Sequence, residues 1–236
     1  MPRRVHLILF DVDGTLLLSG GAGARALDDA FRDLFGQPGA MRKVRPHGKT
    51  DPAICQEMFR AHLGREGTAE ELARLMARYL ELLPGCVTAS RNFHLMPGIP
   101  GALEALAARA DVVLGLGTGN FERGARIKLE RGGLNGYFPF GGYGDDSQDR
   151  VALLEAGFRR GEERLRRRHP GARAARWVVG DTWRDVQAGR ACGARVIAVA
   201  TGGDTLHGLA GAAPDHLFAD LRREGDLLGA LDGRAG

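Results

Sequence analysis

The chain has 236 residues, of which 44% are hydrophobic and 26% charged, with 36 Gly and 10 Pro. This composition is typical of a globular protein of one or two domains, and it excludes fibrous and wholly disordered proteins. The net charge of +4 at pH 7 is small and indicates no particular partner. Three cysteines that lie far apart do not form a disulfide framework, so we expect a reducing cytoplasm as the location.

The first predicted element is a buried strand over Val5–Phe10. Its apolar run stops at Asp11, which makes it shorter than the hydrophobic region of a signal peptide, about 7–15 residues. The sequence contains no run of about 18 apolar residues, so we expect neither a membrane-spanning segment nor a membrane partner.

Between residues 20 and 97 the patterns are helical and no strand is predicted. Helices are expected over three ranges: Ala22–Phe35, Ile54–Leu63 and Leu72–Leu83. Asp51 and Pro52 suit the N-cap and first position of the second helix, and Thr68 with Glu71 forms a capping box before the third. An inserted helical subdomain is the simplest account of this region.

From residue 112 onward, predicted strands alternate with predicted helices. The strands are Val112–Leu116, Tyr137–Phe140, Trp177–Val179, Val196–Val199 and His216–Phe218. The helices are Phe121–Arg131, Val151–Arg168, Asp185–Ala191 and Leu221–Leu231. This alternation predicts an α/β fold with a doubly wound, Rossmann-like parallel sheet, in which ligands bind beyond the carboxyl ends of the strands.

Paired carboxylates follow two of these strands. Asp11 and Asp13 come directly after the first strand and point the same way if the chain stays extended, and Asp181 and Asp185 follow Trp177–Val179. Such pairs bind a hard cation, attack as nucleophiles or transfer protons. Two acidic clusters at the ends of separate strands repel each other unless a cation lies between them, and oxygen ligands indicate Mg²⁺. Taken alone, Asp185 is equally well explained as a charge that complements a helix N-terminus.

A third polar segment, Thr118-Gly119-Asn120, follows the strand at Val112–Leu116. It departs from the dinucleotide fingerprint because Asn120 stands where that motif needs glycine, and a hydroxyl near a helix start favours phosphate binding instead. A phosphoryl site also needs a fixed cation. We expect Arg150 to supply it, because Lys128 lies ten positions beyond Thr118, about 15 Å along a helix.

Together these segments resemble the four motifs of the haloacid dehalogenase superfamily phosphatases, in the same order and over nearly the whole chain. The helical insert resembles the cap domain of that family. Gly48-Lys49-Thr50-Asp51 and Pro97-Gly98 resemble phosphoglycolate-phosphatase-like members. The resemblance implies an α/β catalytic core over residues 1–18 and 96–236, and an α-helical cap over residues 19–95.

The resemblance also implies a role for each acidic residue. Asp11 would be the nucleophile that forms an aspartyl-phosphate, and Asp13 the general acid and then base. Mg²⁺ would be held by Asp11, the backbone carbonyl of Asp13 and Asp181, with Asp185 ligating the ion or orienting a bound water. Arg150 would stand in place of the usual third-motif lysine, a change that keeps the charge but alters the donor geometry.

The substrate implied by the resemblance is a small phosphorylated metabolite, similar to phosphoglycolate, hydrolysed by a monomer or homodimer. Thr118 would donate to the phosphoryl group, with Gly119 and Asn120 beside it. His47 and Lys49 of the insert are candidates for contacts with the rest of the substrate.

Two other functions are compatible with the sequence. A sugar-phosphate mutase of the β-phosphoglucomutase type shares the same carboxylates and cap. An arginine-rich stretch over Arg159–Arg176 is typical of a nucleic-acid-binding module, but Glu162 and Glu163 interrupt it. A solvated helix face explains that stretch better, so we expect no nucleic-acid partner.

Overall fold

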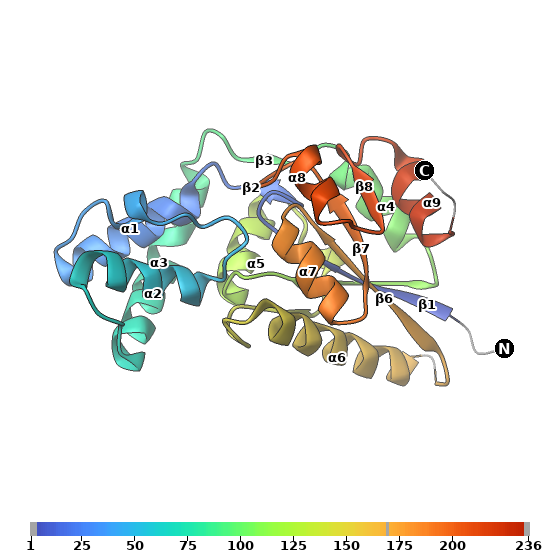
Figure 1. Ribbon diagram of the computed structural model, residues 1–236, viewed down its shortest axis with the longest axis horizontal. Coiled ribbons are helices and arrows are strands. Elements are labelled where there is room, and N and C mark those ends of the chain that lie inside the picture. Colours follow the sequence, from blue (N-terminus) through green and yellow to red (C-terminus); the bar gives the residue numbers. More distant parts are fainter. Residues whose placement is uncertain (1–3, 169, 234–236) are drawn as a thin grey trace.

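The computed structural model describes residues 4–168 and 170–233, in which a parallel sheet lies between helices (Figure 1). The strands of this sheet are β1 (Arg4–Phe10), β4 (Val112–Gly117), β5 (Gly141–Gly142), β6 (Arg173–Gly180), β7 (Arg195–Val199) and β8 (His216–Phe218). The longer helices are α1 (Ala22–Phe35), α2 (Asp51–Leu63), α3 (Ala69–Thr88), α4 (Ile99–Ala107), α5 (Glu122–Arg131), α6 (Arg150–Arg168), α7 (Trp183–Ala191), α8 (Leu206–Gly211) and α9 (Glu224–Leu231).

The six strands of this sheet have the order β5-β4-β1-β6-β7-β8, and every adjacent pair is parallel. The chain starts in the middle, fills one side with β4 and β5, and then fills the other, which confirms the predicted doubly wound α/β fold. Phe10 of β1 is paired with Leu116 of β4 and with Val179 of β6. The three central strands therefore end at the same level, where ligands bind in such sheets.

Alternate residues of β1 face opposite layers of helices, as the period of a strand requires. Leu7 and Leu9 belong to the apolar cluster of α6 and α7, whereas Ile8 and Phe10 belong to the cluster of α4, α5 and α9. All four side chains are fully buried. A strand that is apolar on both faces is typical of a parallel sheet covered on both sides.

Helices α1, α2 and α3 gather beyond the carboxyl ends of the strands and enclose a second apolar core, which Phe121 at the start of α5 also joins (Figure 1). The rings of Phe31, Phe35 and Phe59 meet in this core, with centroids 4.8–5.3 Å apart. The predicted capping box of Thr68 and Glu71 opens α3 as expected.

The N-cap of α2 differs from the prediction by one residue. Thr50 is the N-cap, and its hydroxyl accepts a hydrogen bond from the Ala53 amide, while Asp51 is the first helical residue. The carboxylate of Asp51 is thereby free to bond outside its own helix.

Two short strands, β2 (Leu17–Leu18) and β3 (His94–Leu95), form an antiparallel pair at the two connections to the helical segment. The prediction of no strand between residues 20 and 97 was therefore wrong at β3. Two residues are too few for a periodic pattern, and only their pairing partner defines them as a strand.

The strand predicted over Tyr137–Phe140 was also wrong. A short 3₁₀ helix, Asn135–Tyr137, occupies its start, and β5 follows it at Gly141–Gly142. Phe138 is fully buried in the core beneath the sheet, so its apolar character reflects packing and not strand pairing. Helices α4 and α8 were not predicted, and neither was the 3₁₀ helix at Ala40–Lys43.

Among the residues that the structure describes, no helix combines the length and apolar character needed to cross a bilayer.

Candidate active site

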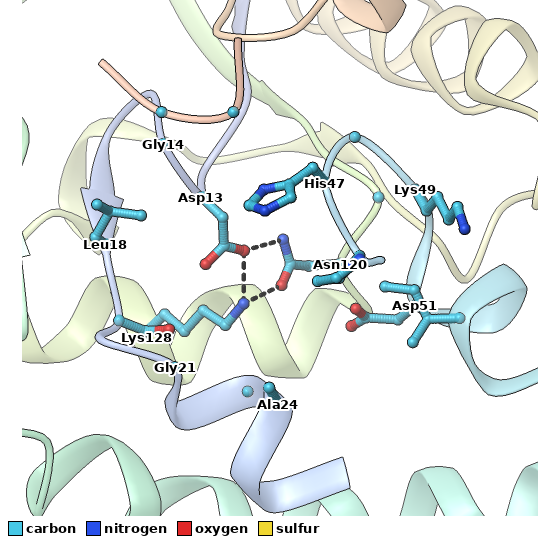
Figure 2. Close-up of a pocket in the computed structure, with 18 of the residues that line it drawn as sticks. Asp13, Gly14, Leu18, Gly21, Ala24, His47, Lys49, Asp51, Asn120 and Lys128 are labelled. Atoms are coloured by element: carbon cyan, nitrogen blue, oxygen red, sulfur yellow. Dashed lines mark hydrogen bonds and ion pairs between the residues drawn. The ribbon is translucent and has the colours of Figure 1, made fainter. Parts of the chain in front are cut away.

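The register of the central strands brings the polar segments predicted from the sequence to one edge of the sheet. A pocket of about 470 Å³ opens there, between the strand ends and the helices α1, α2 and α3 (Figure 2). Its lining includes every predicted site residue except Asp185, which lies directly behind Arg150: Asp11, Asp13, His47, Lys49, Thr118, Gly119, Asn120, Arg150 and Asp181.

Three buried carboxylates form a cluster, two of them in the pocket lining and Asp185 behind it. Oxygens of Asp11, Asp181 and Asp185 all lie within 4.8 Å of one another. Burial raises the pKa of Asp11 to about 6 even though the charge of Arg150 lowers it. Burial, with repulsion from Asp185 and Asp11, raises the pKa of Asp181 to about 8. Asp11 and Asp181 are therefore costly to ionise without a cation beside them.

The donor set of this cluster fits a hard divalent cation. It offers only oxygen atoms, as Mg²⁺ requires, and a cation would relieve the repulsion that raises the pKa values. Thr15 donates to Asp181 at 3.1 Å, and the Gly203 amide donates to the other oxygen of the same carboxylate. These bonds hold Asp181 in place at the end of β6.

Asp185 is held by two neighbours inside the cluster. Its Oδ2 accepts from the Thr182 amide at 3.0 Å and from the Thr182 hydroxyl at 2.7 Å, which caps the N-terminus of α7. Its Oδ1 accepts from Arg150 Nε at 3.0 Å. Asp185 therefore caps a helix and also belongs to the acidic cluster.

Arg150, at the start of α6, reaches the residue predicted to be the nucleophile. Its guanidinium lies 3.1 Å from Asp11 Oδ2, and its side chain is only 9% exposed. The cation predicted for a phosphoryl site is therefore in contact with Asp11 and Asp185 together.

Lys128 also lies in the pocket, and the prediction that it is too far from the site was wrong. Its ammonium donates to Asp13 Oδ2 and to Asn120 Oδ1, both at 2.6 Å, and its side chain is only 6% exposed. Helix α5 runs alongside the pocket, and side chains on a helix tilt toward its N-terminus, so Lys128 returns toward the strand end. Distance along the helix axis was therefore the wrong measure.

The segment Thr118-Gly119-Asn120 connects these groups. Asn120 Nδ2 donates to Asp13 at 2.9 Å and to the Thr118 hydroxyl at 2.8 Å, while Thr118 itself is fully buried beside Asp11. Asp13, Asn120 and Lys128 thus form a closed triangle of hydrogen bonds (Figure 2).

The loop before α2 covers one side of the pocket. His47 lies near Asp13 and Asn120, whereas the Lys49 side chain extends away from them and pairs with Glu57 (Figure 2). A side chain on Gly119 would come within 2.6 Å of the Lys49 carbonyl oxygen, so this close approach requires glycine.

Asp51, which the sequence pattern predicts as the N-cap of the second helix, lines the pocket. Its amide donates to Gly119 O at 2.7 Å, and its Oδ2 accepts from the Phe121 amide at 3.0 Å. Burial raises the pKa of this carboxyl to about 6. The bonds join the helical segment directly to the polar loop that follows β4.

Sequence reasoning missed Tyr79 and the pair Gly202-Gly203, which also line the pocket. Tyr79 lies in the apolar stripe of α3 and cannot be told from a core residue by spacing. The glycine pair follows β7, so the sequence could have predicted a turn there at the edge of the sheet where ligands bind.

The arginine-rich stretch lies outside the pocket lining, on α6 and β6. Arg160 pairs with Asp146, and Arg176 pairs with Glu155 and Glu162. These two arginines are therefore engaged by carboxylates of the protein itself.

Comparison with known proteins agrees with this geometry. The family profile of the haloacid dehalogenase-like hydrolases matches residues 5–193. The chain belongs to this family. It is therefore a hydrolase, and the family resemblance inferred from the sequence is confirmed.

Two relatives and one solved structure illustrate the similarity. A phosphoglycolate phosphatase from Synechococcus elongatus is 30% identical over 234 residues, which cover 96% of this chain and 97% of the relative. One from Pseudomonas savastanoi pv. phaseolicola is 27% identical and covers 96% and 80%. The crystal structure of a hydrolase from Pseudomonas syringae has the same fold, with a TM-score of 0.67, 24% identity, and coverage of 98% and 100%.

Proposed function

We propose that this hydrolase is a Mg²⁺-dependent phosphatase that cleaves a small phosphate monoester through an aspartyl-phosphate on Asp11. The observation that supports this most directly is the grouping around Asp11. Asp11 is buried, lies 3.1 Å from the Arg150 guanidinium, and belongs to an acidic cluster that fits a divalent cation. A carboxylate with a guanidinium and a metal ion beside it is suited to attack an anionic phosphate.

In the first step, Asp11 attacks phosphorus while the ester P–O bond breaks and Asp13 gives a proton to the leaving alcohol oxygen. In the second step, water attacks the phosphorus of the aspartyl-phosphate, Asp13 takes the water proton, and phosphate leaves. Lys128 and Asn120 hold Asp13 in place through both steps. Arg150 and Thr118 would stabilise the charge that develops on the transferring phosphoryl oxygens.

Mg²⁺ would offset the negative charge shared by the nucleophile and the phosphate. Asp11, Asp181 and the backbone carbonyl of Asp13 would hold it, with Asp185 completing the acidic set. The finding that supports this assignment is the oxygen-only cluster described above.

We also propose that residues 19–95 form a cap over a core of residues 1–18 and 96–236. The separate apolar core of α1–α3 and the short pairing of Leu17 with Leu95 support this division. Phosphoglycolate is the first substrate to test, because both curated relatives carry that name. The three cysteines are free thiols, which fits a reducing cytoplasm.

The test is steady-state release of p-nitrophenol from p-nitrophenyl phosphate, with Mg²⁺ and with a chelator. Asp11→Asn removes the proposed nucleophile at almost constant shape, and we expect it to abolish turnover in a folded protein. Asp232→Asn, an equivalent change at an exposed carboxylate, should retain full activity. A folded Asp11→Asn enzyme that still turns over would contradict the nucleophile. Sugar-phosphate isomerisation without phosphate release would instead support the mutase.

A further inference from the structure

Part of the pocket, the chamber, has apolar walls made by six residues of β2 and the helical segment: Leu18, Ala24, Leu27, Met41, Ile54 and Tyr79. Ser19, Asn92 and His94 add polar groups to the lining of the same pocket. The whole cavity, about 470 Å³, falls in the range of about 300–1,000 Å³ in which pockets enclose drug-sized ligands. Phosphoglycolate carries only a CH₂–COO⁻ unit beyond its phosphate and would leave most of this chamber empty.

The cations of the pocket are already paired with carboxylates of the protein. Lys49 pairs with Glu57, Lys128 with Asp13, and Arg150 with Asp11 and Asp185. Among the described residues that line the pocket, no Lys or Arg is left without such a partner.

The chamber is also unfavourable to a second negative charge on the substrate. Asp51 places a further carboxylate in the lining, and among the residues that the structure describes only the Phe121 amide donates to it. An anionic group that leaves water for this space would lose its hydration without gaining an unpaired cation.

Tyr79 offers a neutral polar contact within the apolar walls. Its side chain is 1% exposed, and within residues 4–168 and 170–233 no group hydrogen-bonds its hydroxyl. A Cβ added at Gly23 would lie 3.8 Å from this hydroxyl and 3.6 Å from Lys128 Nζ. The hydroxyl therefore borders the space beside Gly23, where an alcohol or carbonyl oxygen of a ligand would satisfy it.

We propose, resting on the phosphatase function proposed above, that the substrate is a phosphate monoester of a neutral alcohol with an apolar body. The apolar walls bind the body of the alcohol, and Tyr79 binds an uncharged oxygen on it. On this point the chain departs from relatives named for phosphoglycolate.

The test compares kcat/KM for methyl, propyl and hexyl phosphate with kcat/KM for 2-phosphoglycolate, all with Mg²⁺. These alkyl esters differ little in the reactivity of the leaving group, so the series reports on binding of the alcohol. We expect kcat/KM to rise roughly fourfold with each methylene that the chamber buries. Hexyl phosphate should exceed phosphoglycolate by at least about tenfold.

A variant of the chamber wall tests the same proposal from the protein side. Gly23→Ala adds a methyl group beside Tyr79 and Lys128 at ordinary contact distance, in the first turn of α1, where alanine is the better helix former. We expect the ratio of kcat/KM for hexyl over methyl phosphate to fall about tenfold. Gly85→Ala, in α3 where nothing surrounds the added methyl group, should leave the ratio unchanged.

The outcomes separate this proposal from the function on which it rests. Hydrolysis of phosphoglycolate in preference to hexyl phosphate, or a ratio insensitive to Gly23→Ala, overturns the apolar alcohol and keeps the phosphatase. Failure to hydrolyse any of the esters with Mg²⁺ overturns both.

Discussion

Replacing Lys128 with methionine removes one charge from the pocket at nearly constant length and shape. The ammonium makes a hydrogen bond of 2.6 Å to Asp13 and another of 2.6 Å to Asn120. Asp13, which we propose as the general acid and base, would keep only its bond from Asn120 Nδ2 at 2.9 Å.

The expected size of the effect follows from these contacts. A hydrogen bond between charged groups contributes about 1.5–3 kcal/mol, equivalent to roughly 10- to 150-fold in rate if the transition state depends on it fully. The Asp13 side chain is 39% exposed, so water replaces part of the lost contact and the lower part of this range applies. We expect kcat to fall about 10- to 30-fold.

The assay is steady-state hydrolysis with saturating Mg²⁺, using p-nitrophenyl phosphate and an alkyl phosphate in parallel. The p-nitrophenolate ion leaves with little help from an acid, whereas an alkoxide needs a proton. If Lys128 acts through Asp13, the loss in kcat is therefore at least about threefold larger for the alkyl ester.

Two controls accompany this variant. Arg123→Met, an exposed position on the same helix, should retain the wild-type kcat. Urea unfolding should give a free energy of unfolding within about 1 kcal/mol of wild type, because the desolvation cost of the buried ammonium is lost together with its ion pair. A folded Lys128→Met enzyme with kcat within twofold of wild type on both esters would refute the link to Asp13.

Three further predictions concern other parts of the molecule. Arg150→Met removes the cation beside Asp11 and leaves Asp185 buried without its guanidinium partner. We expect kcat/KM for p-nitrophenyl phosphate to fall about 10³-fold, a larger loss than for Lys128→Met. Equal losses for the two variants would contradict a distinct role for Arg150. Burial lowers the pKa of His6 in the folded protein below 6.5, and Trp177 donates to its ring at 3.0 Å. Below about pH 6.5, His6 therefore binds a proton more readily in the unfolded chain than in the folded protein. The free energy of unfolding falls for this reason as the pH drops below about 6.5. Urea unfolding at pH 7 and 5.5 should show a smaller loss for His6→Gln than for wild type, and an identical loss would refute the assignment. Gly98→Ala should lower the free energy of unfolding by more than about 3 kcal/mol, because φ is +86° and the new Cβ would lie 2.0 Å from the Leu221 carbonyl, whereas Gly136→Ala meets no neighbour and should cost little in the same measurement.

Local sequence patterns were sufficient to predict most of the core. Apolar runs such as Val196–Val199 are buried on both faces of a parallel sheet, and their alternation with helical patterns leaves few possible topologies. The patterns were insufficient at β5, where Gly141 and Gly142 form a strand without any side chain to signal it. A side chain at Gly142 would come within 1.8 Å of the Leu153 carbonyl oxygen, so close packing of α6 decides that position.

The candidate site also has features that follow from the sequence and features that depend on the tertiary structure. That Asp11, Thr118 and Asp181 lie together follows from the sequence, because each comes directly after a central strand and parallel strands end at one edge. Their register, with Phe10 opposite both Leu116 and Val179, then places them at one level.

The sequence by itself determined the fold class, the functional edge of the sheet and the acidic residues at that edge. Only the tertiary structure decided which cation meets which carboxylate, with Arg150 at Asp11 and Lys128 at Asp13. It also decided that Tyr79 of α3 lies against the pocket. The physical reason is that strand order and periodicity are local properties of the chain. The partners of a long side chain depend instead on how helices distant in sequence pack against each other, and no local pattern records that packing.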